Sequence, residues 1–201
     1  MEGIQSKESQ SNNLVAQSES SILRILEKID LAGYLPKNSN EIEIALLGAG
    51  IPIEVLPLTV YFASNGFGKP RIVAFDKEES CRKFADSYFN SEDVRLEYRA
   101  GEDVDLASPD TLGVRSYDMV IVRKPDVHNS KHKWEKIFEN GFSHLKPGGI
   151  FLATTDLYAD FVLDQLRKGG QVVKEYTIPQ PDRIAPFFTE ADLFVAKKAV
   201  K

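Results

Sequence analysis

From residue 41 onward the chain alternates between short runs of β-forming apolar residues and longer stretches with a helical pattern. This alternation predicts β–α–β units, in which parallel strands form one sheet and right-handed crossovers place helices on both of its faces. The five apolar runs are 42–47, 71–75, 94–98, 117–122 and 150–154. The helical stretches between and after them are roughly 58–63, 78–89, 131–144 and 157–168.

Two further strand-like runs, 171–178 and 192–197, follow the last helical stretch, and a proline-rich loop without a helix joins them. Consecutive strands that lack a crossover helix pair in the antiparallel sense. The predicted fold is therefore α/β: a Rossmann-like doubly wound sheet of five parallel strands plus a C-terminal antiparallel hairpin, seven strands in all, with helices on both faces.

The first 21 residues have a different composition, because eleven of them are Ser, Gln or Asn. Such a segment buries too little apolar surface to offset its ordering entropy, so residues 1–21 are predicted to be a mobile polar tail. An amphipathic pattern follows, with apolar residues at i, i+3, i+4 and i+7: Ile22, Ile25, Leu26 and Ile29. It predicts an added N-terminal helix within 22–35, at the start of a single domain that covers 22–201.

Size and charge exclude several classes of protein. The 201 residues fit one domain, and the net charge of −5 argues against a nucleic-acid clamp. The lone Cys81 cannot form an intramolecular disulfide or a Cys-rich metal site. No apolar run approaches the ~20 residues that span a bilayer, and the N-terminus lacks the pattern of a secretory signal. We therefore expect a cytoplasmic protein without a metal or a membrane partner, and a homodimer is compatible with the sequence.

A glycine-rich turn, Gly48-Ala49-Gly50, follows the first predicted strand. Glycines let the backbone approach a ligand closely, and the carboxyl end of a parallel strand is where open α/β sheets bind ligands. A tight strand-to-helix turn would need the same residues. The dinucleotide fingerprint requires a third glycine three residues after Gly50, where this chain has Ile53, so NAD and FAD are disfavoured.

Acidic residues follow the second and third predicted strands. Asp76 ends the second strand, where a carboxylate can accept hydrogen bonds from both ribose hydroxyls of a nucleoside. Lys77 follows it and is placed to lie along the same nucleoside. Glu102 and Asp103 follow the third strand in the same way. Each of the three acids could instead serve as a helix N-cap.

Two more segments complete a pattern. Asp118 opens the fourth apolar run, and Leu-Lys-Pro-Gly-Gly at 145–149 leads into the fifth. Together with the glycine turn and Asp76, these segments resemble class I S-adenosylmethionine-dependent methyltransferases over about residues 43–155. The chain departs from that class at Leu46, where an acid is common, and at Pro52, where a third glycine is common.

The resemblance implies S-adenosylmethionine as co-substrate and a methyl transfer, most simply to a small-molecule acceptor. The cofactor-binding residues that it implies are Gly48, Ala49, Gly50, Asp76, Lys77, Glu102, Asp103 and Arg123. The loop after the fourth strand would face the methyl group, which makes Lys124, Asp126 and His128 the candidate catalytic residues. His128 is the best proton acceptor among them, although it could equally be an exposed loop histidine.

Other functions remain open at this point. Pro125-Asp126 and the basic run 131–133 resemble, in order, elements of tRNA guanine-N7 methyltransferases, although the acidic net charge disfavours nucleic acid. The glycine turn with 56–59 resembles nicotianamine synthases, which transfer the aminobutyrate chain of the same cofactor. A non-catalytic S-adenosylmethionine-binding module is the third alternative.

Two groups of aromatic residues have predicted places in the fold. Trp134 and Phe138 are predicted to be helix core, and Pro186-Phe187-Phe188 could line an apolar substrate site.

Overall fold

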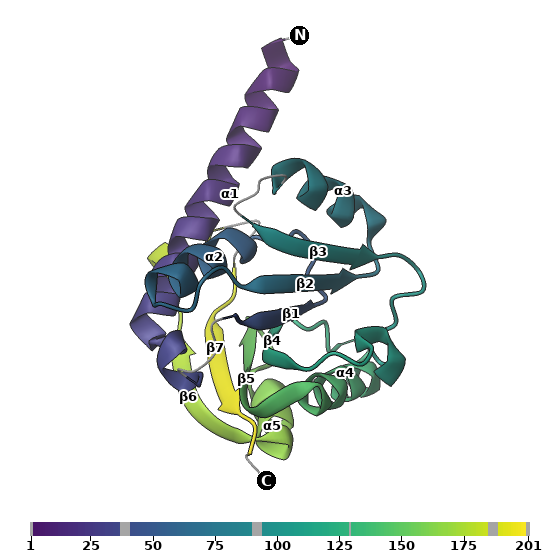
Figure 1. Cartoon of the computed structure of the whole chain (residues 1–201). Helices are drawn as coiled ribbons and strands as arrows, with labels where there is room; N and C mark the ends of the chain where they lie inside the picture. The colour runs from purple at the N-terminus through teal and green to yellow at the C-terminus, as the bar shows by residue number, and fades with distance from the viewer. Residues whose placement is uncertain (1, 37–40, 90–93, 129, 185–188, 200–201) are drawn as a thin grey trace.

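The computed structural model describes residues 2–36, 41–89, 94–128, 130–184 and 189–199, with the backbone alone for residues 2–12. Within them, a seven-stranded sheet has the order β3-β2-β1-β4-β5-β7-β6 (Figure 1). Strands β1 to β5 run parallel, and β7 pairs antiparallel with both β5 and β6. The strands are Glu43–Leu47 (β1), Arg71–Asp76 (β2), Arg95–Ala100 (β3), Tyr117–Arg123 (β4), Leu145–Thr155 (β5), Gln171–Thr177 (β6) and Asp192–Lys197 (β7). The predicted fold is confirmed.

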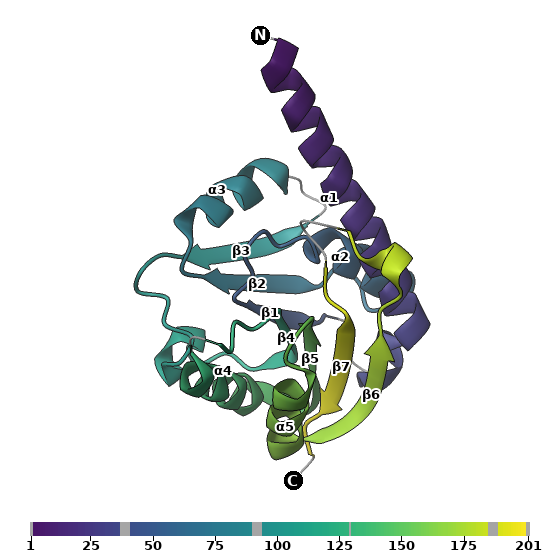
Figure 2. The ribbon, with the colours of Figure 1, turned by 180° about the vertical axis from the view of Figure 1, so that it is seen from behind.

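Helices cover both faces of the sheet, as Figures 1 and 2 show from opposite sides. One face carries the first three helices and the other carries the last two. The α-helices are Glu2–Ile29 (α1), Val55–Ser64 (α2), Glu79–Tyr88 (α3), Lys131–Ser143 (α4) and Ala159–Gly169 (α5). Short 3-10 helices are Leu31–Tyr34 (η1), Pro109–Leu112 (η2) and Gln180–Asp182 (η3). None of the described helices is long and apolar enough to cross a membrane.

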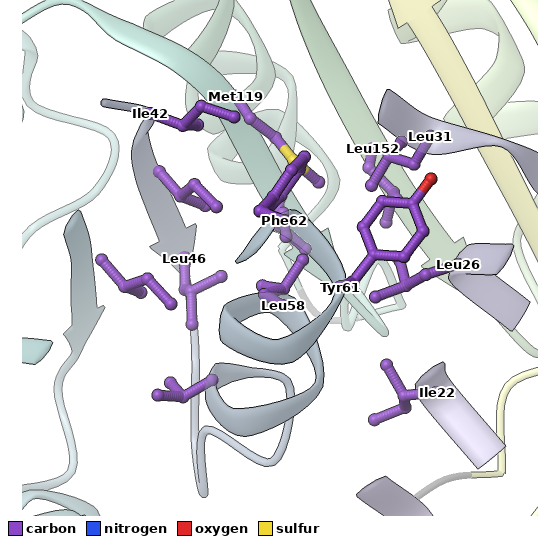
Figure 3. Packing of buried hydrophobic residues seen from close by; sticks show 14 of the residues in the cluster. Ile22, Leu26, Leu31, Ile42, Leu46, Leu58, Tyr61, Phe62, Met119 and Leu152 are labelled. Atoms are coloured by element: carbon purple, nitrogen blue, oxygen red, sulfur yellow. The ribbon is translucent and has the colours of Figure 1, made fainter. Parts of the chain in front are cut away.

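The strands divide their side chains between two hydrophobic clusters because successive residues of a strand point to opposite faces. In β1, Ile44 and Leu46 join the cluster under α1 and α2, whereas Ala45 and Leu47 join the cluster under α4 and α5. Figure 3 shows Leu46 packed near Leu58 of α2 in the first cluster. Both faces of the central strands are thus buried, which explains why the apolar runs are nearly continuous rather than alternating.

The Pro-Gly-Gly segment before the fifth predicted strand is a looped bulge within β5 rather than a turn ahead of it. Tyr117 pairs with Leu145 and Met119 pairs with Ile150, so β5 accommodates three more residues than β4 between these two pairs. A Cβ on Gly149 would lie 2.9 Å from the carbonyl oxygen of Asp118. The Asp118 carboxylate accepts hydrogen bonds from the backbone N–H of Glu43 and the ammonium of Lys146, which ties this loop to β1. These motif residues therefore support the fold.

The N-terminal helix is longer than the sequence pattern predicts. The segment predicted to be a mobile polar tail (1–21) and the added helix (22–35) form one helix from Glu2 to Ile29, followed by η1. Val15 and Ser18 are fully buried, so the buried stripe extends toward the N-terminus by about two turns. The Ser18 hydroxyl donates to the Leu14 carbonyl at 2.9 Å, which satisfies it inside the helix. The first turns of α1 project past the rest of the molecule (Figure 1).

Glu19 is a buried carboxyl between α1 and α3. Its side chain is 9% exposed, Oε2 lies 3.5 Å from the Tyr88 hydroxyl, and Oε1 has no hydrogen-bond partner among the described residues. Burial raises the pKa of Glu19 to about 7, and the Tyr88 hydroxyl offsets a smaller part of that rise. The pKa of Glu19 is higher in the folded than in the unfolded protein. Its contribution to the free energy of unfolding is therefore fully present below the unfolded pKa of ~4.3 and is lost as the pH rises through about 7.

We expect Glu19→Gln to stabilise the protein at pH 8 by about 1–2 kcal/mol, because a neutral amide needs no desolvation of charge. Thermal unfolding followed by circular dichroism between pH 8 and pH 5 measures this. The gain in Tm, a few degrees at pH 8 for a chain of this size, should shrink toward pH 5. The exposed Glu27 on the same helix provides the control, since Glu27→Gln should give no such trend. A gain that is independent of pH would contradict the assignment.

Candidate functional site

The glycine turn after β1 lies at the point where the strand order reverses, between β1 and β4. Gly48 and Gly50 have φ angles of 65° and 55°, which favour glycine because other residues would be strained there. The backbone N–H groups of Gly48 and Ala49 both donate to the Phe75 carbonyl at the end of β2, at 2.9 and 3.0 Å. The turn is therefore folded against the carboxyl end of the neighbouring strand, at the position where doubly wound sheets bind ligands.

Asp76 and Tyr98 fix the turn from two sides. Asp76 is 9% exposed; its Oδ2 accepts from the Gly50 N–H at 2.7 Å, and its Oδ1 accepts from the Glu78 N–H at 2.9 Å. The Tyr98 hydroxyl donates to the Gly50 carbonyl at 2.6 Å, and burial raises the pKa of Tyr98, which keeps it a donor. Each carboxylate oxygen of Asp76 still has acceptor capacity, because one oxygen accepts about two hydrogen bonds.

A cleft of about 330 Å³ opens beside this turn. That volume is within the range of small-molecule sites. Residues from the ends of β1, β2 and β4, from the segment after β3 and from the first half of α4 line it. They are Gly48, Asp76, Lys77, Val104, Leu106, Arg123, Lys124, Asp126, Ser130, Lys133, Trp134 and Ile137. Six residues predicted from the sequence to bind or react thus line one cleft: Gly48, Asp76, Lys77, Arg123, Lys124 and Asp126.

Five predicted site residues do not line the cleft, and two of them, Ala49 and Gly50, lie in the turn beside it. Glu102 and Asp103 are exposed, and Asp103 turns back so that its Oδ1 would lie 2.8 Å from a Cβ on Gly101. The wall of the cleft after β3 is formed instead by Val104 and Leu106. His128 is also exposed and is absent from the lining. The roles of all the predicted site residues, those that line the cleft included, remain predictions.

The apolar wall of the cleft was not predicted from the sequence. Phe138 is buried, as the i, i+4 pattern indicates, but Trp134 is only partly buried and faces the glycine turn. Its Cη2 would lie 3.5 Å from a Cβ on Gly48. The sequence did contain one sign that Trp134 could line the cleft, because it lies in the first turn of a helix that begins at Lys131. The N-terminal turn of a helix that follows a parallel strand lies at the carboxyl edge of the sheet.

Arg123, Glu54 and Glu190, which we call the Arg123 cluster, form a buried charged group at the end of β4. Arg123 Nη1 lies 3.0 Å from Glu54 Oε1, and Arg123 Nε lies 3.3 Å from Glu190 Oε1. The three side chains are 17%, 11% and 1% exposed, respectively. Arg123 Nη2 donates weakly to the Ile51 carbonyl at 3.4 Å, which links the cluster to the lip that follows the glycine turn. No sequence motif pointed to either glutamate.

Lys124 and Asp126 occupy the loop between β4 and α4. Lys124 has a φ of 49°, an unusual backbone angle for a residue with a side chain. Its ammonium lies 3.0 Å from Asp156 Oδ2 and donates to the Thr189 hydroxyl at 2.9 Å. Asp126 is exposed on the cleft wall. This loop therefore presents one cation, held by an ion pair, and one solvated carboxylate to the cleft.

Two residues of the basic run 131–133 have acidic neighbours. Lys133 pairs with Asp105 at 3.1 Å, and His132 lies 3.4 Å from Glu135. Among the residues that the structure describes, no group of three or more His, Cys, Asp or Glu side chains is arranged to hold a metal ion. Pro186-Phe187-Phe188, the suggested apolar lining, lies outside the described residues.

Comparisons with known proteins identify the fold. The sequence matches no protein-family model, and no curated protein matches it. Its structure matches a protein of Listeria monocytogenes assigned to the class I S-adenosylmethionine-dependent methyltransferases, with a TM-score of 0.65 and 17% identity over 90% of this chain. The match spans 60% of the Listeria protein's length.

Two other solved structures match over more of their own length. An S-adenosylmethionine-dependent methyltransferase of Clostridium acetobutylicum has a TM-score of 0.62 and 12% identity, covering 92% of both chains. The magnesium protoporphyrin IX methyltransferase of Synechocystis with bound S-adenosylmethionine has a TM-score of 0.62 and 11% identity, over 92% of this chain and 81% of that one. The chain therefore has the class I methyltransferase fold, as the sequence resemblance implied.

Proposed function

We propose that this protein is an S-adenosylmethionine-dependent methyltransferase that acts on a small-molecule acceptor. The observation that carries the proposal is the cleft at the reversal of strand order, where the glycine turn, the Asp76 carboxylate and the Trp134 ring meet. A structural neighbour, the Synechocystis enzyme, holds S-adenosylmethionine within the same fold.

The residues of the cleft fit the parts of that cofactor. Asp76 supplies acceptor capacity for ribose hydroxyls, and Gly48 and Gly50 carry no side chains that would keep a ligand from the backbone of the turn. Leu106 and Trp134 provide apolar surface for a flat base. The bound cofactor would supply a methyl group on a sulfonium, and the protein's part is to hold an acceptor in line with it, which accounts for much of the acceleration of a bimolecular step.

The two departures from the methyltransferase pattern do not remove cleft residues. Leu46 is 2% exposed and packs in the cluster under α2, so a carboxylate at this position would lie in apolar surroundings (Figure 3). Pro52 is buried in the lip before α2, where its carbonyl accepts from the Val55 N–H at 3.1 Å. Neither residue lines the cleft, so both departures are compatible with the proposed binding mode.

Isothermal titration of the full chain with S-adenosylmethionine and with S-adenosylhomocysteine tests the binding step. We expect both to bind, with saturable heat at ligand concentrations below ~1 mM. The absence of heat at millimolar ligand with folded protein would overturn the proposal. Chromatography of the products after incubation with candidate acceptors then tests the chemistry. Formation of S-adenosylhomocysteine supports methyl transfer, whereas formation of methylthioadenosine would show that the aminobutyrate chain is transferred instead.

A further inference from the structure

Two separate parts of the chain form the apolar walls of the proposed cofactor cleft. The first is the segment 101–116 between β3 and β4, which contributes Val104 and Leu106, and the second is α4, which contributes Trp134 and Ile137. Figures 1 and 2 both show this segment beside α4. The two walls bound the part of the cleft that we assign to a flat base, so their separation decides how closely a base is held.

One buried hydrogen bond joins the two walls. Asn140 of α4 is 9% exposed, and its Nδ2 donates to the Leu106 carbonyl at 3.0 Å. Asn140 lies three residues after Ile137 on the same helix, and both side chains are buried. A buried amide is costly unless its polar atoms are paired, and the same holds for a buried carbonyl. This bond therefore fixes the position of the Leu106 backbone relative to α4.

A second contact between the walls lies nearer the solvent. Lys133 Nζ is 3.1 Å from Asp105 Oδ1, and the two side chains are 53% and 55% exposed. Water and salt screen an ion pair of this kind, which contributes little to stability. Asn140 is therefore the stronger of the two connections.

The ends of the segment are held independently by Glu97 of β3. Its carboxylate accepts from Arg99 Nε and Nη2 at 2.8 and 2.7 Å, and from Arg115 Nη1 at 2.8 Å. Arg99 precedes the segment and Arg115 lies near its end, so this network ties the two ends together. The hydrogen bonds from Arg115 and Arg99 lower the pKa of Glu97 to about 2. Loss of the Asn140 bond should consequently release only the middle of the segment.

We propose that Asn140 is a positioning residue for the cofactor, and that it sets the separation at which both walls contact the flat base. This inference rests on the proposed methyltransferase function. Asn140 does not line the cleft, so it acts through Leu106. Without the amide donor, the Leu106 carbonyl gains by moving toward water, which moves this wall away from α4. A gap of roughly 0.5–1 Å forfeits about a quarter to a half of the dispersion attraction between two surfaces.

The test compares two ligands on the full chain by isothermal titration. S-adenosylhomocysteine carries the base, whereas S-ribosylhomocysteine has the same ribose and homocysteine parts without it. In Asn140→Ala, we expect the affinity for S-adenosylhomocysteine to fall about tenfold and that for S-ribosylhomocysteine to stay within about twofold of the parent. A general loosening of the fold would weaken both ligands alike. An equal loss for the two ligands, or no loss for either, would contradict the inference.

Two further variants separate this effect from stability. Gln165 of α5 is also a buried amide, 6% exposed, and it lies outside the cleft. Gln165→Ala should lower Tm but leave both affinities unchanged. Asn140→Leu keeps most of the side-chain volume while removing the donor, so it should show the same base-dependent loss even if the alanine variant does not fold. Parent-like affinities in Asn140→Leu would refute the positioning role. Failure of the parent to bind S-adenosylhomocysteine at all would instead reject the proposed function.

Discussion

Replacement of Asp76 by alanine is expected to weaken the binding of S-adenosylhomocysteine by at least ~100-fold. The variant loses the acceptor that we assign to the ribose hydroxyls, and each hydrogen bond to a charged group contributes about 1.5–3 kcal/mol. It also loses the 2.7 Å bond that fixes the Gly50 N–H, so the glycine turn is less well ordered before the ligand arrives. Two such bonds correspond to about 3 kcal/mol, and every 1.4 kcal/mol is tenfold in Kd.

Titration calorimetry on Asp76→Ala, Asp76→Asn and the control Asp86→Ala measures this effect. Asp86 is exposed on α3, outside the cleft, and its replacement should leave Kd within twofold of the parent. Asp76→Asn keeps one acceptor oxygen and should lose less affinity than the alanine variant. If Asp76→Ala is folded and binds as tightly as the parent, the cofactor does not use this carboxylate, and the role of Asp76 is confined to the turn and to the Glu78 N–H.

Replacement of Arg123 by methionine is expected to destabilise the fold by roughly 3–5 kcal/mol, the usual result of removing one partner from a buried ion pair. Arg123 is the only cation that the described contacts place on Glu54, and Glu54 and Glu190 would face each other as buried carboxylates without it. Glu190 already contributes to raising the pKa of Glu54. Since the raised pKa belongs to the folded state, the loss of stability should grow as the pH rises.

Urea unfolding of Arg123→Met at pH 6 and pH 8 measures the loss and its direction with pH. The triple variant Arg123→Met/Glu54→Gln/Glu190→Gln separates charge from packing, because it removes both unpaired carboxylates. We expect it to recover most of the lost stability, as neutral replacements of buried ion pairs often do. A triple variant as unstable as the single one would show that Arg123 acts through its packing in the sheet.

Fold prediction succeeded here because it depends on local pattern. Every strand-like run from 42 to 197 became a strand. The central runs are apolar throughout because both of their faces are buried, whereas the edge strands β3 and β6 are only partly buried. The glycine turn and Asp76 could also be placed, because chain connectivity alone brings the carboxyl ends of neighbouring parallel strands to one edge.

The sequence pattern does not specify which individual side chains packing buries or brings to the cleft. Ser18 reads as a polar residue of a mobile segment, but its hydroxyl bonds within α1 and its small side chain lies on the buried face. Glu102 and Asp103 follow a strand in the expected manner, yet the chain turns so that Val104 and Leu106 reach the cleft. A one-residue change in the path of a loop exchanges the side chain that faces a ligand, and no sequence pattern specifies that path.

The sequence by itself determined the order of the elements, the doubly wound sheet and the edge of the sheet at which the cleft lies, because periodicity and glycine placement are properties of neighbouring residues. Only the tertiary structure decided that Glu54, Arg123 and Glu190 meet and that α1 covers them. Those three residues come from the start of α2, the end of β4 and the segment before β7. Their charges interact strongly only because the fold removes them together from water, and an uncompensated charge is costly in such surroundings.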